Sequence, residues 1–281
     1  MGFLSLLISI LAESSGKTVD KFNFRRTHIT PRLYMFLVFL AMTGSLLLFI
    51  IFTKQPLPKF SLVTIGLILL VAIFSFGSNV FDCMSLKVDD LSLREPLIDF
   101  QPIMAGLIGY VIFPAERKTS FLAAFIVAAF IVRWGIHRRK LREFQAKGMF
   151  YLSVAVVLEA FLPTLYKESL YHMSPIYIAF FRLALVLVLT SIFFPAKKLR
   201  GITPSKVWYS LIAGIIYTIG AVAAIYAIKV LGVVLTMLFL MLGPALRYLS
   251  GYFILREKVR RGEVIASLLL ALVVLIAAVA R

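Results

Sequence analysis

Two stretches of equal length decide the fold: DDLSLREPLIDFQPIMAGLIGYVIF at residues 89–113 and LGVVLTMLFLMLGPALRYLSGYFIL at residues 231–255. A constant shift of 142 residues lays the first over the second and aligns a proline, a glycine and several apolar residues. The aligned pairs are Pro102 with Pro244, Leu107 with Leu249, Gly109 with Gly251, Tyr110 with Tyr252 and Ile112 with Ile254. Agreement of this length within one chain predicts an internal repeat.

The beginning of the chain supports the same repeat at a slightly larger shift of 146 residues. Glu13 then falls on Glu159, and Lys21 falls on Lys167. We therefore divide the chain into a first half at 1–136 and a second half at 145–281, joined by a basic linker.

The composition is that of a membrane protein. Of the 281 residues, 61% are hydrophobic and only 15% are charged, whereas soluble domains carry about 25% charged residues. The formal net charge of +17 comes mostly from Lys and Arg in short segments between apolar runs. Basic residues in such places set membrane topology and contact anionic lipid head groups, so we expect membrane lipids and no nucleic acid as partners.

Apolar runs of about 20 residues mark membrane-spanning helices. The predicted spans are 1–24, 33–52, 60–82, 90–113, 119–134, 149–167, 176–194, 206–228, 231–255 and 263–280. The fold class expected is all-α and integral to the membrane, with ten transmembrane helices in two repeats of five. Because five is odd, the second repeat must enter the membrane with the opposite orientation. Inverted repeats of this kind are typical of secondary transporters.

The order of short motifs resembles the EamA-type transporters of the drug/metabolite transporter (DMT) superfamily. In that family the first helix of each half carries a lysine, the second an arginine and the fourth a mid-span proline, followed by a turn with a glutamate. The matching residues are Lys21, Lys167, Arg182, Pro102, Pro244, Glu116 and Glu257. This chain differs in placing Glu13 and Glu159 where the family tends to have tryptophan. The resemblance implies a multi-pass carrier of the cytoplasmic membrane.

Charged residues in the fourth predicted span are the first site candidates. Glu95, Asp99, Pro102, Gly106 and Gly109 follow one face of a continuous helix. A carboxylate facing lipid costs a few kcal/mol, about 3 on permissive scales, so Glu95 and Asp99 are predicted to face a wet cavity and bind substrate. The alternative is a helix that starts near Pro96 and leaves Glu95 at the interface as part of a capping box. The pair of glycines is best explained by close helix packing.

The remaining candidates lie on the first, second and fourth helices of the halves. Arg247, deep in the ninth span, and Arg182 are expected to bind an anionic group, or to form structural ion pairs. The acids and lysines at matching places of the two first helices are expected to line the pathway, although lysines also end helices at lipid head groups. These are Glu13, Lys21, Glu159 and Lys167. The two prolines, Pro102 and Pro244, are predicted as mid-helix hinges.

The function expected is secondary active transport of a small polar or charged, amino acid-like metabolite, with protons or a cation as a coupling ion. We expect no catalysis, cofactor or metal, because no motif for them occurs. The alternatives are a flippase for a lipid-linked head group and a membrane enzyme acting on lipid phosphates. Orientation stays open: the basic segments oppose both termini, which places the termini outside, whereas the resemblance implies cytoplasmic termini.

Overall fold

The computed structural model describes residues 1–86, 97–137, 146–193, 202–243, 246 and 261–279. These residues form ten α-helices and one short 3-10 turn, and no strand occurs among them. The first-half elements are α1 (Gly2–Thr27), α2 (Pro31–Thr53), α3 (Leu62–Leu86), α5 (Phe100–Ile112), η1 (Pro114–Glu116) and α6 (Thr119–His137). The second-half elements are α7 (Ala146–Ser169), α8 (Pro175–Phe193), α9 (Pro204–Leu231), α10 (Val233–Leu240) and α12 (Arg261–Val279). The predicted all-α class is confirmed.

Helix boundaries follow local breakers in the sequence. Pro31, Pro175 and Pro204 each occupy the first position of a helix, where proline lacks only an N–H that has no partner within the helix. Thr30 caps α2, because its side chain accepts a hydrogen bond from the backbone N–H of Leu33.

Five helices are long and apolar enough to cross a membrane: α2, α3 as far as Asp82, α7, α8 and α9. Parts of α5, α6 and α12 are shorter apolar helices. The polar helix α1 is outside both groups, although its 26 residues cover the predicted first span. Large apolar side chains also point outward, including Leu48 at 56% and Leu268 at 65% exposure. Extensive apolar surface of this kind suits lipid rather than water.

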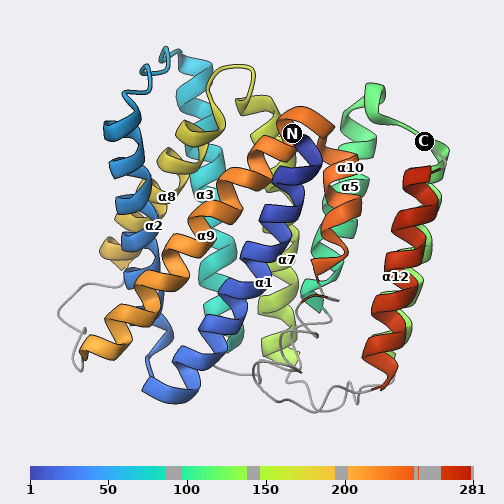
Figure 1. Ribbon diagram of the computed structural model, residues 1–281, viewed down its shortest axis with the longest axis horizontal. Coiled ribbons are helices and arrows are strands. Elements are labelled where there is room, and N and C mark those ends of the chain that lie inside the picture. The colour runs from blue at the N-terminus through green and yellow to red at the C-terminus, as the bar shows by residue number, and fades with distance from the viewer. Residues whose placement is uncertain (87–96, 138–145, 194–201, 244–245, 247–260, 280–281) are drawn as a thin grey trace.

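The helices run alternately down and up in Figure 1, and α1 begins at the same edge at which α12 ends. The most extensive helix contacts pair α1 with α9 and α3 with α7. Helix α2 packs on α8 and α9, and α8 also packs on α3. On the other side of the molecule, α5 packs on α10 and α7, while α12 packs on α6. The ten helices thus form one continuous bundle.

The predicted packing role of the two glycines in α5 is confirmed. A Cβ at Gly106 would collide with the ring of Phe125 on α6, and one at Gly109 would collide with Val233 on α10. Both glycines are buried, and the Phe125 side chain is fully enclosed. Small residues here let α5 approach two neighbours at once.

Two predicted spans are interrupted in the structure. In the fourth span, residues 97–98 are helical, Asp99 is a turn with right-handed helical backbone angles and α5 begins at Phe100, whereas residues 90–96 lie outside the described residues. Pro102 explains this start, since it cannot donate the backbone hydrogen bond that would continue the helix from residue 98. It therefore lies in the first turn of α5, and its predicted place in the middle of a longer span stays a prediction. The ninth span begins with a break at Gly232, which separates α9 from α10.

Candidate functional site

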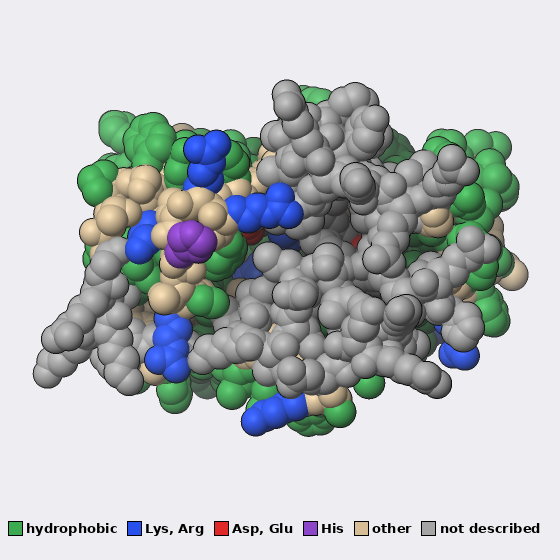
Figure 2. All heavy atoms as spheres, turned by 90° about the horizontal axis from the view of Figure 1, so that it is seen from below, with side chains coloured by type: hydrophobic (Ala, Val, Ile, Leu, Met, Phe, Trp, Pro, Cys, Tyr) green, Lys and Arg blue, Asp and Glu red, His purple; other side chains and the backbone are tan. Residues whose placement is uncertain are grey.

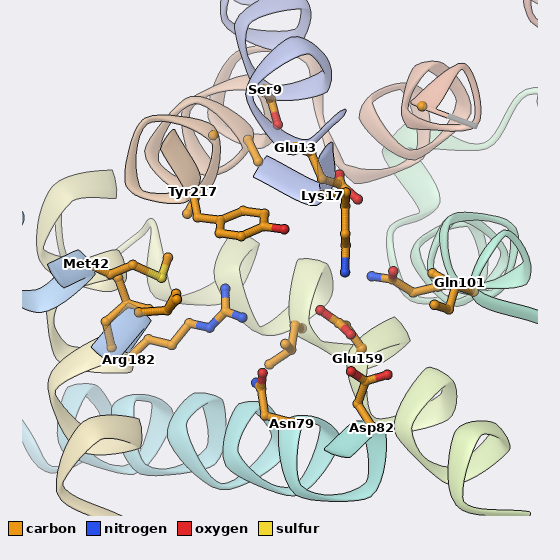
Figure 3. A pocket seen from close by; sticks show the side chains of 18 of the residues that line it. Ser9, Glu13, Lys17, Met42, Asn79, Asp82, Gln101, Glu159, Arg182 and Tyr217 are labelled. Atoms are coloured by element: carbon orange, nitrogen blue, oxygen red, sulfur yellow. The ribbon is translucent and has the colours of Figure 1, made fainter. Parts of the chain in front are cut away.

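A cavity of about 360 Å³ lies at the centre of the bundle, where α1, α2, α3, α5, α7, α8, α9 and α10 meet (Figure 3). This volume is within the range of small-molecule sites, about 300–1,000 Å³. The cavity reaches Phe24 and Pro31, at the edge where α1 gives way to α2. Figure 2 looks onto that edge, and acidic and basic side chains are visible in its depth.

The cavity wall is strongly charged for a membrane protein. Four carboxylic acids and two basic residues are found among its described lining residues: Glu13, Asp20, Asp82, Glu159, Lys17 and Arg182. Ionisable side chains within a membrane bundle are expensive to bury and face a water-filled space or a partner. The excess of acids makes this cavity attractive to a cationic group.

Arg182 supplies the basic part of the wall and is held by two contacts. Its Nε donates a hydrogen bond of 2.8 Å to Ser75 Oγ on α3, and its guanidinium carbon lies 5.5 Å from the centre of the Tyr166 ring. Figure 3 shows the end of the guanidinium directed into the cavity. Because Nε is already engaged, the terminal nitrogens are oriented for a fork-like contact with a carboxylate.

Glu159 of α7 lies opposite, within electrostatic reach of Arg182, Asp82, Lys17 and Glu13. Figure 3 shows Lys17 extending from α1 toward Gln101 and Glu159, with Asp82 of α3 beside them. Acids from three helices therefore gather around one lysine. The amine of a ligand could replace the Lys17 ammonium as the ionic partner of one of these acids.

Asp20 forms a third polar feature of the wall. The hydroxyl of Tyr34 donates to one carboxylate oxygen, and the hydroxyl of Tyr217 donates to the other. These contacts join α1, α2 and α9. Gly16 makes room for them, because a Cβ at that position would collide with the Tyr217 ring.

The structure brings three predicted site residues together: Glu13, Glu159 and Arg182 all line the cavity. Pro102 lines it too, and its hinge role stays a prediction. The predicted repeat had assigned the two acids equivalent places on the first helix of each half, here α1 and α7.

Two predicted site residues lie elsewhere. Lys167 pairs with Glu116 instead of lining the cavity, since it is eight residues past Glu159, or about 12 Å further along the helix axis. Asp99 is buried but is not among the residues that line the cavity. Its neighbours Ile98 and Gln101 do line the cavity.

The remaining predictions cannot be compared with the structure. Glu95, Pro244 and Arg247 lie outside the described residues, and the side chain of Lys21 does as well. Their proposed roles stay predictions.

Sequence reasoning did not select several cavity residues as site candidates. Lys17 and Asp20 follow Glu13 at four and seven residues, so the helical period already placed them on one face. Asp82 was placed at the end of a span, whereas α3 continues to Leu86 and holds Asp82 one turn inside. Tyr34 and Tyr217 carried no comparable signal, because tyrosine is common in any membrane helix. Within the described ranges, no group of His, Cys, Asp and Glu could hold a metal ion.

The apolar helices and outward-facing apolar side chains define a multi-pass helical membrane protein with a charged central cavity. Residues 146–279 match the model of the EamA-like transporter family. The second half of this chain is therefore an EamA-like transporter domain, and the resemblance to the DMT superfamily is confirmed.

Comparison with solved structures supports the fold. A crystal structure of another protein superposes with a TM-score of 0.77 at 15% sequence identity, covering 99% of this chain and 99% of the other. At that identity the similarity concerns the fold alone. No curated protein matches this chain.

Proposed function

We propose that the protein is a secondary active transporter that moves a small zwitterionic metabolite, similar to an amino acid, across the cytoplasmic membrane by alternating access. The observation that carries this proposal is the presence of Arg182 and Glu159 in one central cavity. The first would bind a carboxylate and the second an ammonium group. The EamA-like domain supports transport as the general activity.

The cavity wall supports a substrate with both charges. Arg182 is anchored by Ser75, so its free edge offers a pre-arranged contact for a carboxylate. Glu13, Asp82 and Glu159 offer negative charge around Lys17 on the other side. A purely anionic substrate would meet this acidic surplus, which disfavours sugar phosphates. The same acids are candidates for coupling transport to protons or a cation.

The pattern of helix packing supports two inverted repeats. Exchanging α1 with α7, α2 with α8, α3 with α9 and α6 with α12 converts the contact of α1 on α9 into that of α7 on α3. It likewise converts α2 on α9 into α8 on α3, and maps the α2–α8 and α6–α12 contacts onto themselves. Equivalent helices also run in opposite directions, as α1 and α7 do in Figure 1. Halves at 1–136 and 145–281 that rock about the cavity are the natural mechanism for this symmetry.

Ligand-induced thermal stabilisation of the purified protein tests the substrate class. The probes are α-amino acids, the matching decarboxylated amines and the matching N-acetyl acids. A ligand that binds only the folded state stabilises it by about 2.7 kcal/mol at a concentration 100 times its Kd. Wild type is expected to respond most strongly to zwitterions, because only these satisfy both sides of the cavity.

Two variants separate the two charges. Arg182→Gln should lose the preference for zwitterions over amines, and Glu159→Gln should lose the preference for zwitterions over N-acetyl acids. Arg117→Gln is the matched control, since Arg117 is exposed and, among the described residues, donates to carbonyl groups of its own neighbourhood, at Tyr110 and Val111. Equal responses of all variants to zwitterions would contradict the proposal. A response confined to lipid-linked head groups would favour a flippase.

A further inference from the structure

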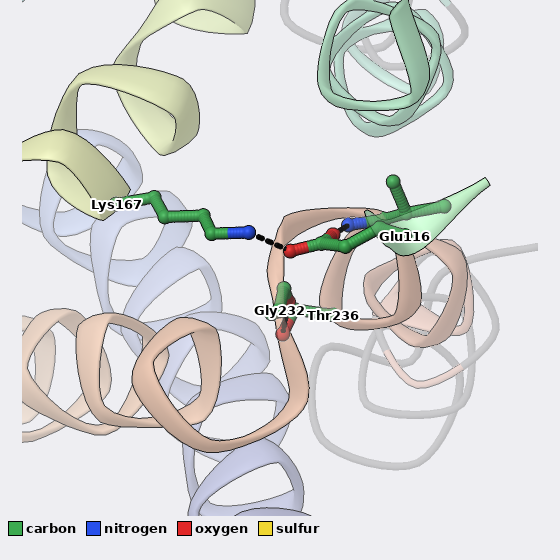
Figure 4. Close-up of polar contacts among 5 residues, drawn as sticks. Glu116, Lys167, Gly232 and Thr236 are labelled. Carbon is green, nitrogen blue, oxygen red and sulfur yellow. Dashed lines mark hydrogen bonds and ion pairs between the residues drawn. The ribbon is translucent and has the colours of Figure 1, made fainter. Parts of the chain in front are cut away.

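Glu116 connects the two halves of the chain at the edge of the bundle that holds both termini. It belongs to the turn η1 of the first half, and its carboxylate contacts two elements of the second half (Figure 4). One oxygen forms an ion pair with Lys167 near the end of α7. The other accepts a 2.8 Å hydrogen bond from the backbone N–H of Val234 in the first turn of α10.

This contact is a built feature with several supports. Helix α10 has no side-chain cap of its own, and Glu116 supplies the acceptor and negative charge that a helix N-terminus favours. Gly232 has φ 85°, and a Cβ there would collide with the Glu116 carboxylate. The Lys167 ammonium also lies 3.9 Å from the centre of the Phe113 ring.

The ion pair is shielded from solvent. The Lys167 side chain is 18% exposed and that of Glu116 is 13% exposed. Removing one partner of such a pair leaves the other charge poorly solvated, which strongly disfavours the closed arrangement. The pair is therefore sensitive to conservative substitutions.

The position of the pair relative to the cavity suggests its role. The cavity reaches Phe24 and Pro31 at the opposite edge, and toward the terminal edge its described lining ends at residues such as Ile228 on α9. Ile228 is 2% exposed, and its carbonyl accepts the N–H of Gly232, which packs against Glu116. Glu116 and Lys167 thus lie just beyond the end of the cavity that Ile228 lines.

We propose that Glu116, Lys167 and the N-terminus of α10 form a latch that holds the cavity closed at the terminal edge and must open during transport. This inference rests on the proposed alternating access between two halves. Because Glu116 belongs to one half and its two partners to the other, rocking of the halves must separate them. Breaking the latch should shift the resting population toward an arrangement that is open at the terminal edge.

Cysteine accessibility tests the latch without knowledge of the substrate. The single native cysteine, Cys83, is changed to serine, and Ile228→Cys places a thiol at the terminal end of the cavity. The protein is reconstituted in vesicles, and a membrane-impermeant maleimide is applied from the side that exposes an N-terminal tag. Glu116→Gln is expected to raise the labelling rate by about 5-fold or more, the usual scale of conformational coupling.

The controls separate loss of the latch from other effects. Arg117→Gln removes a neighbouring charge that, among the described residues, donates to carbonyl groups of its own half, and should leave the rate unchanged. Lys167→Gln removes the ion pair but keeps the hydrogen bond from Val234 to Glu116, and it should also raise the labelling rate. If Glu116→Gln does not fold, the labelling rate of Lys167→Gln tests the latch in its place. Unchanged labelling in a folded latch variant would overturn the latch.

The same preparations distinguish this inference from the proposed function. Thermal stabilisation by α-amino acids is measured on each variant. Faster labelling without any amino acid response would support the latch and contradict the substrate class. Normal amino acid responses with unchanged labelling would support the substrate class and contradict the latch.

Discussion

Arg182 of α8 donates a 2.8 Å hydrogen bond to Ser75 of α3, so a side chain of the first half orients the guanidinium of the second. Ser75 is completely buried. The arginine that we propose to bind the substrate carboxylate is therefore positioned across the boundary between the halves.

Removing this support should weaken substrate binding while leaving the fold intact. A hydrogen bond between membrane helices contributes about 0.6–2 kcal/mol, so Ser75→Ala is expected to raise KM by roughly 3- to 30-fold. Uptake into proteoliposomes measures it. Ser78→Ala is the control, because Ser78 is a buried serine on the same helix that bonds the Ser75 carbonyl. An equal effect of both substitutions would point to a general change in α3.

The two tyrosines that donate to Asp20 should stabilise the fold. Tyr217→Phe removes one donor from a carboxylate in the bundle interior, and the free energy of unfolding is expected to fall by about 1–3 kcal/mol. Gly16→Ala should have a similar effect, since its Cβ would displace the Tyr217 ring. Thermal unfolding in detergent measures both. Tyr226→Phe, on the same helix but 36% exposed, should change little; a comparable loss there would refute the assignment.

The glycines of the apolar helices should differ sharply in their tolerance of alanine. Gly106→Ala forces a methyl group into the Phe125 ring, and overpacking of this kind costs about 1–3 kcal/mol. Gly44→Ala meets no atom within 4 Å and should be neutral or stabilise α2 by up to about 1 kcal/mol through helix propensity. Melting temperatures of the two variants test this. Similar temperatures would show that α5 is not tightly packed on α6.

Gly232 should be indispensable to the junction of α9 and α10. Its φ of 85° strains any residue with a side chain, and a Cβ would occupy the place of the Glu116 carboxylate. Gly232→Ala is therefore expected to lower the free energy of unfolding by about 1–3 kcal/mol. Because part of this loss acts through Glu116, the effects of Gly232→Ala and Glu116→Gln should not add in the double variant. If the two effects add in a double-mutant cycle measured by thermal unfolding, Gly232 and Glu116 stabilise the protein independently, which would contradict this prediction.

The sequence by itself determined the all-helical membrane class and indicated Glu13 and Glu159, which the structure places in the cavity wall. Apolar runs, prolines and the helical period are local properties of the sequence. A predicted repeat adds to them, because a candidate residue in one half indicates the equivalent residue in the other. Asp99 is buried between Ile98 and Gln101, which line the cavity, but it is not itself among the lining residues, and its proposed role stays a prediction.

Only the tertiary structure decided which neighbour each polar residue meets. Lys167 lies on a helix whose earlier residues line the cavity, yet its partner is Glu116, 51 residues away in the chain. Asp20 is held by Tyr34 on α2 and by Tyr217, 197 residues further along the chain. A helical period defines a face of one helix, but the residue opposite that face depends on how several helices pack together.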